Sequence, residues 1–536
     1  MNKAFGLTIF STMFFTFSMV PFPVFAEEAS NPIIWADVPD ISIVRIGDTY
    51  YMSSTTMHLS PGLPIMKSKN LVDWDIVSYA YDVLEDTDGL SLRNEKNEYG
   101  AGSWASSIRY NDGTFYVSTF AGSVGKTFVY STKNVENKPW NETAFRPMLH
   151  DHSLFFDDDG KVYMLHGATD LRLTELKTDL SGVKPGGFDE VVIKNVGYVS
   201  HPEKGWGEGS QIFKINEKYY LCNITWPDMR TQLVHRADSI KGPYEGRVIL
   251  HDQGVAQGGL IDTPDGRWYA YLFQDCGAVG RVPFLVPLKW EDGWPVLGKE
   301  GKIPMRLDIK RERKGLGNLV VSDEFDRPAE LLDRLKTASK RDEYVREAFP
   351  PAWQWNHNPA NMFWSLSDRS GWLRITTGRT DKLLTEARDS LTQRTFGPAC
   401  SATIMIDVSG MKDGDYAGLA ALQKKYGFVG VKMENNIKSI VMVDTDGEGK
   451  ILGEKYVSFE GNTVHLRIDC DFRNRKDEAM FFWSLDGKDW TPIGKPFHMI
   501  YTLPHFMGYR FALFYFATQN PGGHVDFDYY RIDGVE

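Results

Sequence analysis

Cysteine is scarce in this chain of 536 residues. The four cysteines (Cys222, Cys276, Cys400 and Cys470) lie far apart without CxxC or Cys/His spacing, so neither a zinc site nor a disulfide framework is indicated. A Cys400–Cys470 bridge stays open beside the simpler expectation of buried free thiols. Basic residues are also in deficit. The formal net charge of −11 argues against a nucleic-acid partner, because phosphate binding needs concentrated Lys and Arg.

Long apolar runs are missing except at the N-terminus. Lys3 precedes a largely apolar stretch over residues 4–20, and residues 24–26 (Val-Phe-Ala) suit a cleavage site. Residues 1–26 are therefore predicted to be a signal peptide of an exported protein, periplasmic or secreted. The alternative is a retained membrane anchor, which two prolines before the cleavage site disfavour. After cleavage we expect no membrane association.

Aromatic residues, in contrast, are plentiful at 13%, with 15 Trp and 24 Tyr. This enrichment is typical of all-β folds and of sugar binding, where flat rings stack on the apolar faces of sugars. A chain of this length is too long for one hydrophobic core, so two domains are expected.

A turn-and-strand pattern recurs five times between residues 47 and 269. Each copy has a tight turn of Gly, Asp or Asn followed by large aromatic or β-branched residues, which is a hairpin signal. The tyrosines that end the copies (Tyr51, Tyr116, Tyr163, Tyr220 and Tyr269) are 65, 47, 57 and 49 residues apart. This spacing suits one four-stranded sheet per copy and predicts an all-β, five-bladed β-propeller over residues 27–305. A generic β-sandwich with common hairpins is the alternative.

One position of the repeat collects polar side chains. Eleven or twelve residues before the five tyrosines stand Asp40, Trp104, Asp151, Glu208 and Gln257. The first strand of each propeller blade lines the central channel, so equivalent positions should meet at one mouth. Three carboxylates in a partly dry pocket repel one another, so at least one should have a raised pKa. A single acid could equally cap a turn, but the shared register indicates a site for glycosidic bond cleavage.

These segments resemble glycoside hydrolase family 43. The run Val-Pro-Asp-Ile-Ser around Asp40 looks like the opening-blade segment, Asp-His-Ser-Leu-Phe from Asp151 like the third-blade motif, and Gly-Glu-Gly around Glu208 like the fourth-blade motif. The resemblance spans residues 31–300. It implies that Asp40 is the general base, that Glu208 is the general acid, and that Asp151 modulates the pKa of the acid and orients the substrate. It also implies that Arg281 contacts the terminal sugar.

Several residues depart from the family pattern. Ile41 stands where a second Pro is common, and Trp104 precedes Ala-Ser-Ser where Ala-Pro is common. Gln257 replaces a His that in many members helps to hold a channel ion or water. Trp104, Gln257 and the loop residue His58 are expected to bind substrate, with an ordinary loop histidine as the equal alternative for His58. No cofactor and no metal are expected to be required, and the sequence offers no clear ligand set for a structural calcium ion.

The second half has a different pattern. Residues 306–319 are predicted to be a linker, and residues 320–536 resemble the concanavalin-like β-sandwich that follows the propeller in one branch of the family. Residues 327–347 are charged and helix-prone and are expected to form a surface insertion. Whether the tryptophans of this domain touch substrate or fill its core stays open.

The resemblance implies an exo-acting, inverting hydrolase that releases terminal α-L-arabinofuranose from a plant polysaccharide or oligosaccharide, with a β-xylosidase as the alternative. Arabinofuranose is preferred because the segment 57–62 (Met-His-Leu-Ser-Pro-Gly) looks closer to the branches of the family with that activity. Inversion would set the carboxylates of Asp40 and Glu208 about 6.5–9.5 Å apart, against about 5–5.5 Å for retention. A retaining fructoside hydrolase shares the five-blade plan, but its Trp-Met-Asn-Asp-Pro and Arg-Asp-Pro motifs are absent. A non-catalytic glycan-binding propeller is disfavoured by the three intact acids.

Overall fold

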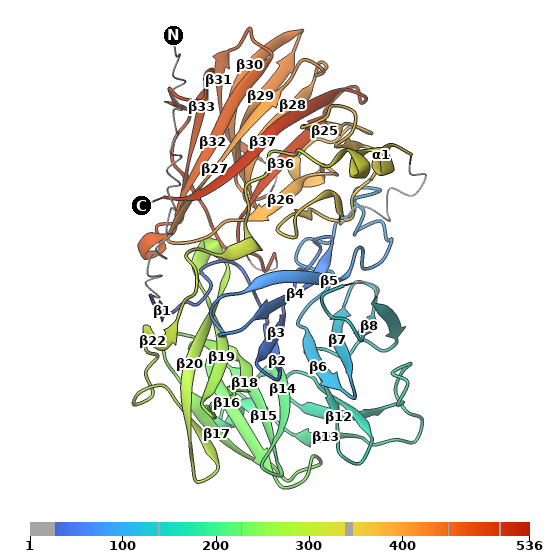
Figure 1. The fold of residues 1–536 in the computed structure, drawn as a ribbon, viewed down its shortest axis with the longest axis vertical. Helices are drawn as coiled ribbons and strands as arrows, with labels where there is room; N and C mark the ends of the chain where they lie inside the picture. The colour runs from blue at the N-terminus through green and yellow to red at the C-terminus, as the bar shows by residue number, and fades with distance from the viewer. Residues whose placement is uncertain are drawn as a thin grey trace, which may run out of the picture.

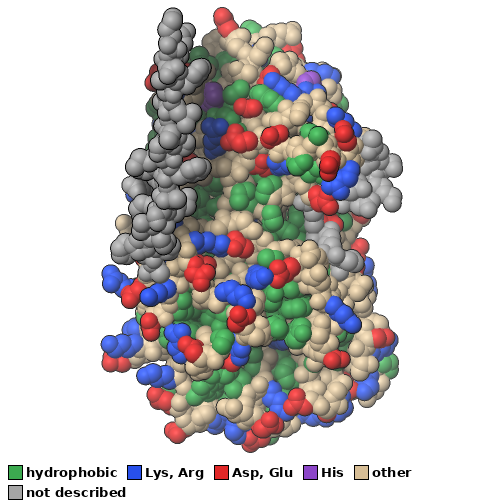
Figure 2. Space-filling view, in the orientation of Figure 1, with side chains coloured by type: hydrophobic (Ala, Val, Ile, Leu, Met, Phe, Trp, Pro, Cys, Tyr) green, Lys and Arg blue, Asp and Glu red, His purple; other side chains and the backbone are tan. Residues whose placement is uncertain are grey.

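The computed structural model describes residues 27–137, 140–226, 228–337, 347–448, 450–502 and 505–535. The predicted signal peptide lies outside these residues. Two strand-rich domains are stacked along the long axis of the molecule, with the N-terminal domain below and the C-terminal domain above (Figure 1). Charged side chains of both signs are interspersed over the described part of the face in Figure 2. No helix in the described ranges is long and apolar enough to cross a membrane.

The lower domain is a five-bladed β-propeller, as predicted. Each blade is a four-stranded antiparallel sheet of consecutive strands. The first blade contains β2 (Ser42–Ile46), β3 (Thr49–Ser53), β4 (Gly62–Ser68) and β5 (Asp75–Tyr81), and the second contains β6 (Ser107–Asn111), β7 (Thr114–Ala121), β8 (Lys126–Thr132) and β9 (Asn141–Phe145). The third contains β10 (Ser153–Phe156), β11 (Val162–His166), β12 (Leu171–Leu176) and β13 (Asp189–Ile193), and the fourth contains β14 (Glu208–Ile215), β15 (Lys218–Thr225), β16 (Thr231–Ala237) and β17 (Glu245–Leu250). The fifth contains β18 (Ala256–Asp262), β19 (Trp268–Asp275), β20 (Arg281–Glu291) and β21 (Trp294–Leu297).

The first strands of the five blades form a closed ring. β2 contacts β6, β6 contacts β10, β10 contacts β14, β14 contacts β18, and β18 returns to β2. The N-terminal segment supports this closure, because β1 (Glu28–Ser30) pairs with β22 (Arg306–Lys310) and the Asn31 side chain donates to the carbonyls of Leu285 and Pro304 at 2.9 Å. The start of the chain is thereby tied to the last blade.

The repeated aromatic residues interlock neighbouring blades. Ring centroids lie 5.1 Å apart for Tyr51 and Phe115, 4.7 Å for Tyr116 and Phe156, 6.1 Å for Phe155 and Tyr219, and 5.2 Å for Tyr220 and Trp290. Each pair joins one blade to the next. Three of these pairs are edge-to-face and Tyr116–Phe156 is tilted, and aromatic pairs stabilise by about 0.5–1.5 kcal/mol beyond the area that they bury. The sequence repeat is therefore the packing repeat of the propeller.

The upper domain is a β-sandwich, as the resemblance implied. One sheet has the order β23-β26-β36-β28-β29-β30-β31 and the other has the order β24-β25-β37-β27-β32-β33-β34, with β35 also on β33. The strands are β23 (Gln354–Trp355), β24 (Trp364–Ser365), β25 (Leu373–Thr376), β26 (Leu391–Arg394), β27 (Ala399–Asp407), β28 (Asp415–Leu422), β29 (Gly427–Glu434), β30 (Ile437–Thr445), β31 (Ile451–Ser458), β32 (Thr463–Asp471), β33 (Glu478–Ser484), β34 (Thr491–Pro492), β35 (Phe497–His498), β36 (Arg510–Ala517) and β37 (His524–Gly534).

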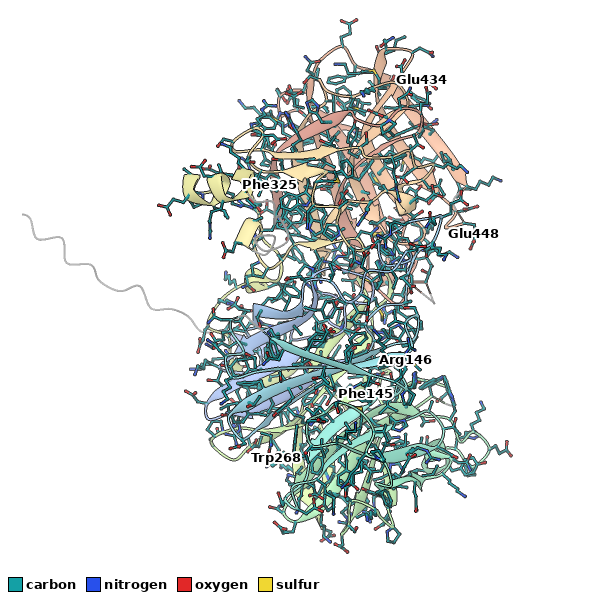
Figure 3. All side chains as sticks on the ribbon, turned by 90° about the vertical axis from the view of Figure 1, so that its right-hand side faces the viewer. Phe145, Arg146, Trp268, Phe325, Glu434 and Glu448 are labelled. Carbon is teal, nitrogen blue, oxygen red and sulfur yellow. The ribbon has the colours of Figure 1, made fainter. Side chains whose placement is uncertain are left out.

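Side chains of the sandwich follow the alternation of its strands. In β27 and β32 every second residue is buried, which places one face of the sheet on the core. Phe325 lies in this core, whereas Glu434 and Glu448 lie at the outer edge of the domain (Figure 3). Cys400 and Cys470 face each other in register on β27 and β32, and all four cysteines are free.

Short helical elements complete the described chain. The α-helix α1 (Ala329–Thr337) falls within the predicted insertion and buries three leucines against the sandwich core. The 3-10 turns are η1 (Val196–Val199), η2 (Gly277–Val279), η3 (Gly317–Leu319), η4 (Leu384–Glu386) and η5 (Arg473–Arg475).

The stretch 306–319, predicted as a linker, contains β22 and η3 and is packed on the first blade. Arg311 and Arg313 in this stretch pair with Asp73 and Asp75. Further along the chain, Ser60 and Trp355 exchange two backbone hydrogen bonds of 3.1 and 2.6 Å. The two domains therefore meet along a hydrogen-bonded interface, and loops of the sandwich can reach the mouth of the propeller.

Candidate active site

Five predicted residues meet at one mouth of the propeller channel. Asp40 and Asp151 stand two residues before β2 and β10, and Trp104 stands three residues before β6. Glu208 begins β14, and Gln257 is the second residue of β18. All five stand at the N-terminal ends of the inner strands. Asp40, Asp151 and Gln257 have positive φ angles of 51°, 45° and 69°. Non-glycine residues in this region cost about 1–3 kcal/mol each and cluster at functional sites.

Asp40 is buried and held by two donors. Gln257 Nε2 donates to Asp40 Oδ1 at 2.9 Å, and Arg281 Nη1 donates to both carboxylate oxygens at 3.2 and 3.1 Å. Burial raises the pKa of Asp40, and the positive charge of Arg281 opposes this rise. The result is a fixed carboxylate of raised basicity, which suits the activation of a water molecule.

Arg230 belongs to the same network. Its Nη1 donates to Gln257 Oε1 at 2.7 Å, and its Nε lies 2.9 Å from Asp275 Oδ2. Arg281 Nε reaches Asp275 as well, at 3.2 Å. Alternating charges thus extend outward from Asp40. Arg230 carries no motif that would mark it in the sequence.

Asp151 is the second buried carboxylate. Burial and the neighbouring charge of Glu208 raise the pKa of Asp151 to about 7, although His150 opposes the rise. This agrees with the expectation that three converging acids cannot all be ionised near neutrality. The acid cluster can therefore retain a proton in neutral solution.

Glu208 is bound by a histidine that the sequence reasoning missed. His150 Nε2 lies 3.0 Å from Glu208 Oε2 and 4.0 Å from Asp151 Oδ1. Burial lowers the pKa of His150, but the hydrogen bond to Glu208 and the charge of Asp151 outweigh that effect and raise it overall. Its position directly before Asp151 was the available signal.

Three titratable side chains gather at the open part of the mouth. Titratable atoms of His150, Asp151 and Glu208 lie within 4.8 Å of one another. The pKa values of His150 and Asp151 are both raised, which favours protons retained within the group. We therefore interpret this cluster as a proton-sharing group.

The channel beneath the carboxylates is occupied by Arg109. Its Nη2 donates to Ser153 Oγ at 2.6 Å and to Gln211 Oε1 at 3.2 Å, and its Nη1 lies 3.4 Å from Ser42 Oγ. Burial lowers the pKa of Arg109 to about 10, so the guanidinium remains charged at neutral pH. A calcium ion does not fit beside this cation, because the side-chain oxygen atoms that three blades offer at this point already accept hydrogen bonds from Arg109.

The comparisons with known proteins agree with this geometry. Residues 29–295 match the family model of glycosyl hydrolases family 43, and residues 341–533 match the beta xylosidase C-terminal concanavalin A-like domain. A putative beta-xylosidase of Xylanibacter ruminicola is 30% identical over 86% of this chain and 82% of its own length. The chain belongs to glycoside hydrolase family 43.

Other family 43 proteins show how its relatives are named. A beta-xylosidase of Formosa agariphila is 28% identical, over 94% of this chain and 90% of that protein. The non-reducing end alpha-L-arabinofuranosidase BoGH43B of Bacteroides ovatus is 29% identical, over 64% of each chain. A solved bifunctional GH43-CE protein of Bacteroides eggerthii is 53% identical with a TM-score of 0.89, and it covers 95% of this chain. The present chain spans 64% of the length of that bifunctional protein.

In this family 43 chain, the sandwich completes one wall of the mouth. Phe506 lies 5.4 Å from Trp104 between ring centroids, and the Arg281 guanidinium carbon lies 5.2 Å from the Phe506 ring. Tyr501, on the same loop, faces Arg281 closely enough to alter its electrostatic environment. Sequence reasoning missed both residues, because nothing in a distant domain marks a loop that returns to the propeller.

His58 is the predicted site residue that the structure places elsewhere. Its ring is buried at the domain interface, where Nε2 lies 3.1 Å from Asn356 Oδ1. Its ring neighbours are Tyr99, His357 and His505, at 4.8, 4.4 and 5.5 Å between centroids. Burial lowers the pKa of His58, so the ring is neutral there. Its contacts within the described residues join the two domains and include none of the three acids.

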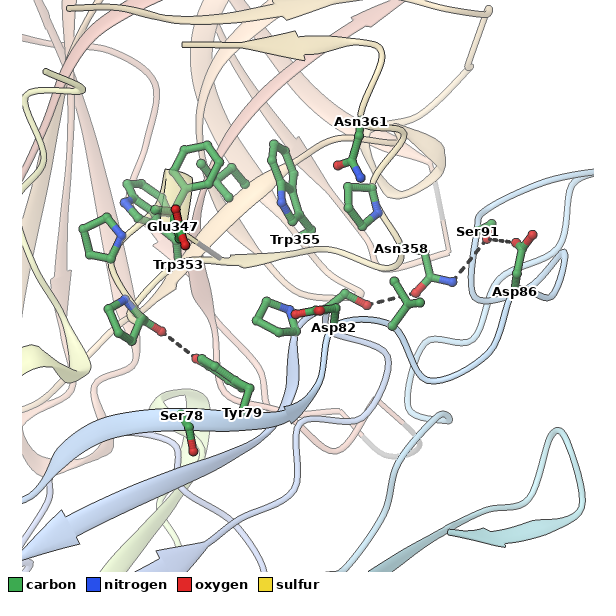
Figure 4. A pocket seen from close by; sticks show the side chains of 18 of the residues that line it. Ser78, Tyr79, Asp82, Asp86, Ser91, Glu347, Trp353, Trp355, Asn358 and Asn361 are labelled. Carbon is green, nitrogen blue, oxygen red and sulfur yellow. Dashed lines mark hydrogen bonds between the residues drawn. The ribbon is translucent and has the colours of Figure 1, made fainter. Parts of the chain in front are cut away.

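A wide groove between the two domains is separate from this site. A groove of about 850 Å³ runs between the outer strands of the first blade and the sandwich (Figure 4), lined by Tyr79, Phe349, Trp353 and Trp355 among others. In this groove the Tyr79 hydroxyl donates to the carbonyl of Pro351 at 2.6 Å, which joins the first blade to the sandwich. Asp40 and Asp151 instead line a much smaller space of about 10 Å³ at the channel mouth. Chemistry rather than volume therefore identifies the active site.

The raised pKa of Asp151 leads to a stability prediction. With a folded-state pKa of about 7 against about 3.9 when unfolded, the stability that protonated Asp151 contributes is complete below about pH 4 and is lost as pH rises through 7. We expect the Asp151→Asn variant to be more stable than the wild type near pH 8, by on the order of 2 kcal/mol. Thermal unfolding midpoints measured between about pH 4.5 and 8 should show the difference between the variant and the wild type becoming smaller as the pH falls.

An Asp526→Asn variant is the matched control. Asp526 is also buried, but it is paired with Arg374 at 2.7 Å, so its removal should destabilise the protein across the range. A stability difference between Asp151→Asn and the wild type that stays constant with pH would contradict a raised pKa of Asp151.

Phe506 leads to a kinetic prediction. Truncation by Phe506→Ala removes an aromatic wall from the pocket that includes Arg281, so we expect kcat/KM on a nitrophenyl pentoside to fall about three- to tenfold, mainly through KM. Leu485→Ala is the control, because Leu485 is 63% exposed on the sandwich. Equal kinetics for the two variants would show that Phe506 is not part of the pocket wall.

Proposed function

We propose that the protein is an exo-acting, inverting glycosidase that releases a terminal pentose from xylan-derived polysaccharide or oligosaccharides. The observation that carries the proposal is the convergence of Asp40, Asp151 and Glu208 at one channel mouth, in a chain of family 43. Asp40, held by Arg281 and Gln257, activates a water molecule. Glu208 protonates the leaving oxygen from the other side.

Asp151 and Arg281 act on position and charge. Asp151 lies in the proton-sharing cluster with His150 and Glu208, so its protonation keeps a proton available to the acid. Arg281 contacts the terminal sugar while it neutralises Asp40 in a dry pocket. In an inverting cycle Glu208 gives a proton to the leaving oxygen, and Asp40 takes a proton from the attacking water. Before the next turnover Asp40 releases its proton to solvent and Glu208 takes one up.

The first candidate for the pentose is β-D-xylose. Four of the relatives are named beta-xylosidases or putative beta-xylosidases, in bacteria as distant as Formosa agariphila and Bacillus subtilis. The sequence preference for α-L-arabinofuranose rested on the segment 57–62, and its His58 contacts the other domain. Arabinofuranose remains the second candidate, which the similarity to the Bacteroides ovatus enzyme supports. Export of the protein to the periplasm or medium is part of the proposal, because such polymers lie outside the cell.

A substrate panel tests the reaction. We expect release of nitrophenol from nitrophenyl β-D-xylopyranoside, with weaker release from the α-L-arabinofuranoside, because the two sugars offer similar hydroxyls to one pocket. Proton NMR of the first sugar formed from xylobiose should show the α-anomer of the released xylose, as inversion requires. A first-formed β-anomer would exclude the assignment of Asp40 as a base.

The acid and base roles separate by leaving group. Glu208→Gln should lose about 10²–10⁴-fold in kcat on xylobiose. It should lose far less on nitrophenyl xyloside, whose leaving group departs without protonation. Asp40→Asn should lose activity on both substrates, because each needs the water to be activated. The control is Glu217→Gln, on the turn of the same blade, where the side chain is 91% exposed. Equal losses for Glu208→Gln on both substrates would refute its role as the acid.

A further inference from the structure

The mouth of the propeller is closed on one side and open on the other. Phe506 from the sandwich lies against Trp104 of the second blade and Arg281 of the fifth. Accordingly, the side chains of Asp40 and Arg281 are only 7% and 6% exposed. Glu208 and His150, on the fourth and third blades, are 23% and 30% exposed. Any part of the substrate that extends beyond the closed pocket therefore leaves over Glu208.

Two tryptophans flank Glu208 at this open side. Trp206 is two residues before Glu208, and Trp226 directly follows β15, whose Ile224 pairs with Glu208 in register. The indole centroids are 3.8 Å apart at an interplanar angle of 78°, and Thr225 Oγ1 donates to the Trp206 carbonyl at 2.7 Å. Because the inner strand begins at the mouth and its antiparallel neighbour ends there, both indoles belong to the same rim as the carboxylate.

This aromatic pair is partly open to solvent. Trp206 is 47% exposed and Trp226 is half-buried, and Tyr198 on the same loop as Trp206 is also 47% exposed. The loop returns on itself at Gly205, where a Cβ would meet Tyr198 Cε1 at 2.8 Å, so the chain brings Tyr198 close to the residue before Trp206. Single exposed apolar residues are ordinary, but an aromatic group gathered beside a catalytic carboxylate indicates a ligand surface.

We propose that Trp206 and Trp226 form the platform that binds the first sugar on the leaving side of the scissile bond, and that this sugar is a xylopyranose. The inference rests on the proposed function, because it takes Glu208 as the group that touches the leaving oxygen. That oxygen belongs to the leaving sugar, so the sugar ring must lie within a few ångströms of Glu208. A xylopyranose in its chair form has two flat apolar faces and equatorial hydroxyls, which suit stacking on an indole.

The platform accounts for either terminal pentose. A xylose at the end of a xylo-oligosaccharide and an arabinofuranose attached to xylan are both linked to a xylopyranose ring. The closed side of the mouth then selects the terminal sugar, and the aromatic rim selects the chain to which it is attached. Specificity for the polymer is therefore located on the fourth blade.

Kinetics on xylotriose test the platform. Trp206→Ala and Trp226→Ala should each lower kcat/KM on xylotriose about tenfold, or about 1.4 kcal/mol, mainly through a higher KM, because each removes a stacking surface for the ring. The inhibition constant of free xylose, which fills the closed pocket alone, should stay within about twofold of the wild type. Trp206→Phe keeps an aromatic face and should retain most of the activity. It also shows whether the loss in Trp206→Ala comes from stacking or from misfolding.

Tyr110→Ala is the matched control, because Tyr110 is a 40% exposed aromatic residue at the opposite end of the inner strand β6. If the wild type cleaves xylotriose and the kcat/KM values of Trp206→Ala and Trp226→Ala equal that of Tyr110→Ala, the platform is overturned and the proposed function stays intact. Changed sedimentation of the tryptophan variants with unchanged kinetics would overturn it as well, since the patch would then join two copies of the chain. A wild type inactive on every pentoside would instead reject the proposed function.

Discussion

The site depends on one constraint, which is that Asp40 must stay ionised in a pocket from which water is largely excluded. An isolated carboxylate there would take up a proton, because burial raises its pKa. The guanidinium of Arg281 and the amide of Gln257 hold the charge in place. Arg281 is in turn balanced by Asp275, and Gln257 is oriented by Arg230. Negative and positive groups thus alternate outward from Asp40 through Arg281 to Asp275, so that each charge is balanced by the next.

The propeller supplies this arrangement because residues far apart in sequence become neighbours around an axis. Asp40 and Arg281 are separated by 241 positions, yet their side chains share two hydrogen bonds. Closure of the ring is therefore a condition of catalysis as well as of stability. The pairing of β1 with β22 and the aromatic interlocks between blades hold the five inner strands in one circle.

The repeat made much of this predictable. A period of hairpin turns indicated five blades, and one register position within it indicated Asp40, Asp151, Glu208, Trp104 and Gln257, all of which stand at one mouth. Arg281 was found through family resemblance, and its contact with Asp40 is now explicit. His58 lies on a loop, and a loop position carries no register, so its segment could not show that the loop turns toward the sandwich. Phe506 could not be predicted from the sequence, because it reaches the site only through the packing of the sandwich on the propeller, which leaves no local sequence pattern.

The two domains divide the work of the site between enclosure and access. Sandwich residues pack over the sector of the mouth that contains Asp40 and Arg281, so these two charges are in a medium of low dielectric and interact strongly. The sector with Glu208 and His150 stays open, so these two groups can exchange protons with solvent. The proposed base needs a dry environment and the proposed acid needs contact with solvent, and one environment cannot serve both. The asymmetry of the mouth meets both requirements, because the sandwich covers one side of a ring whose five blades are otherwise alike.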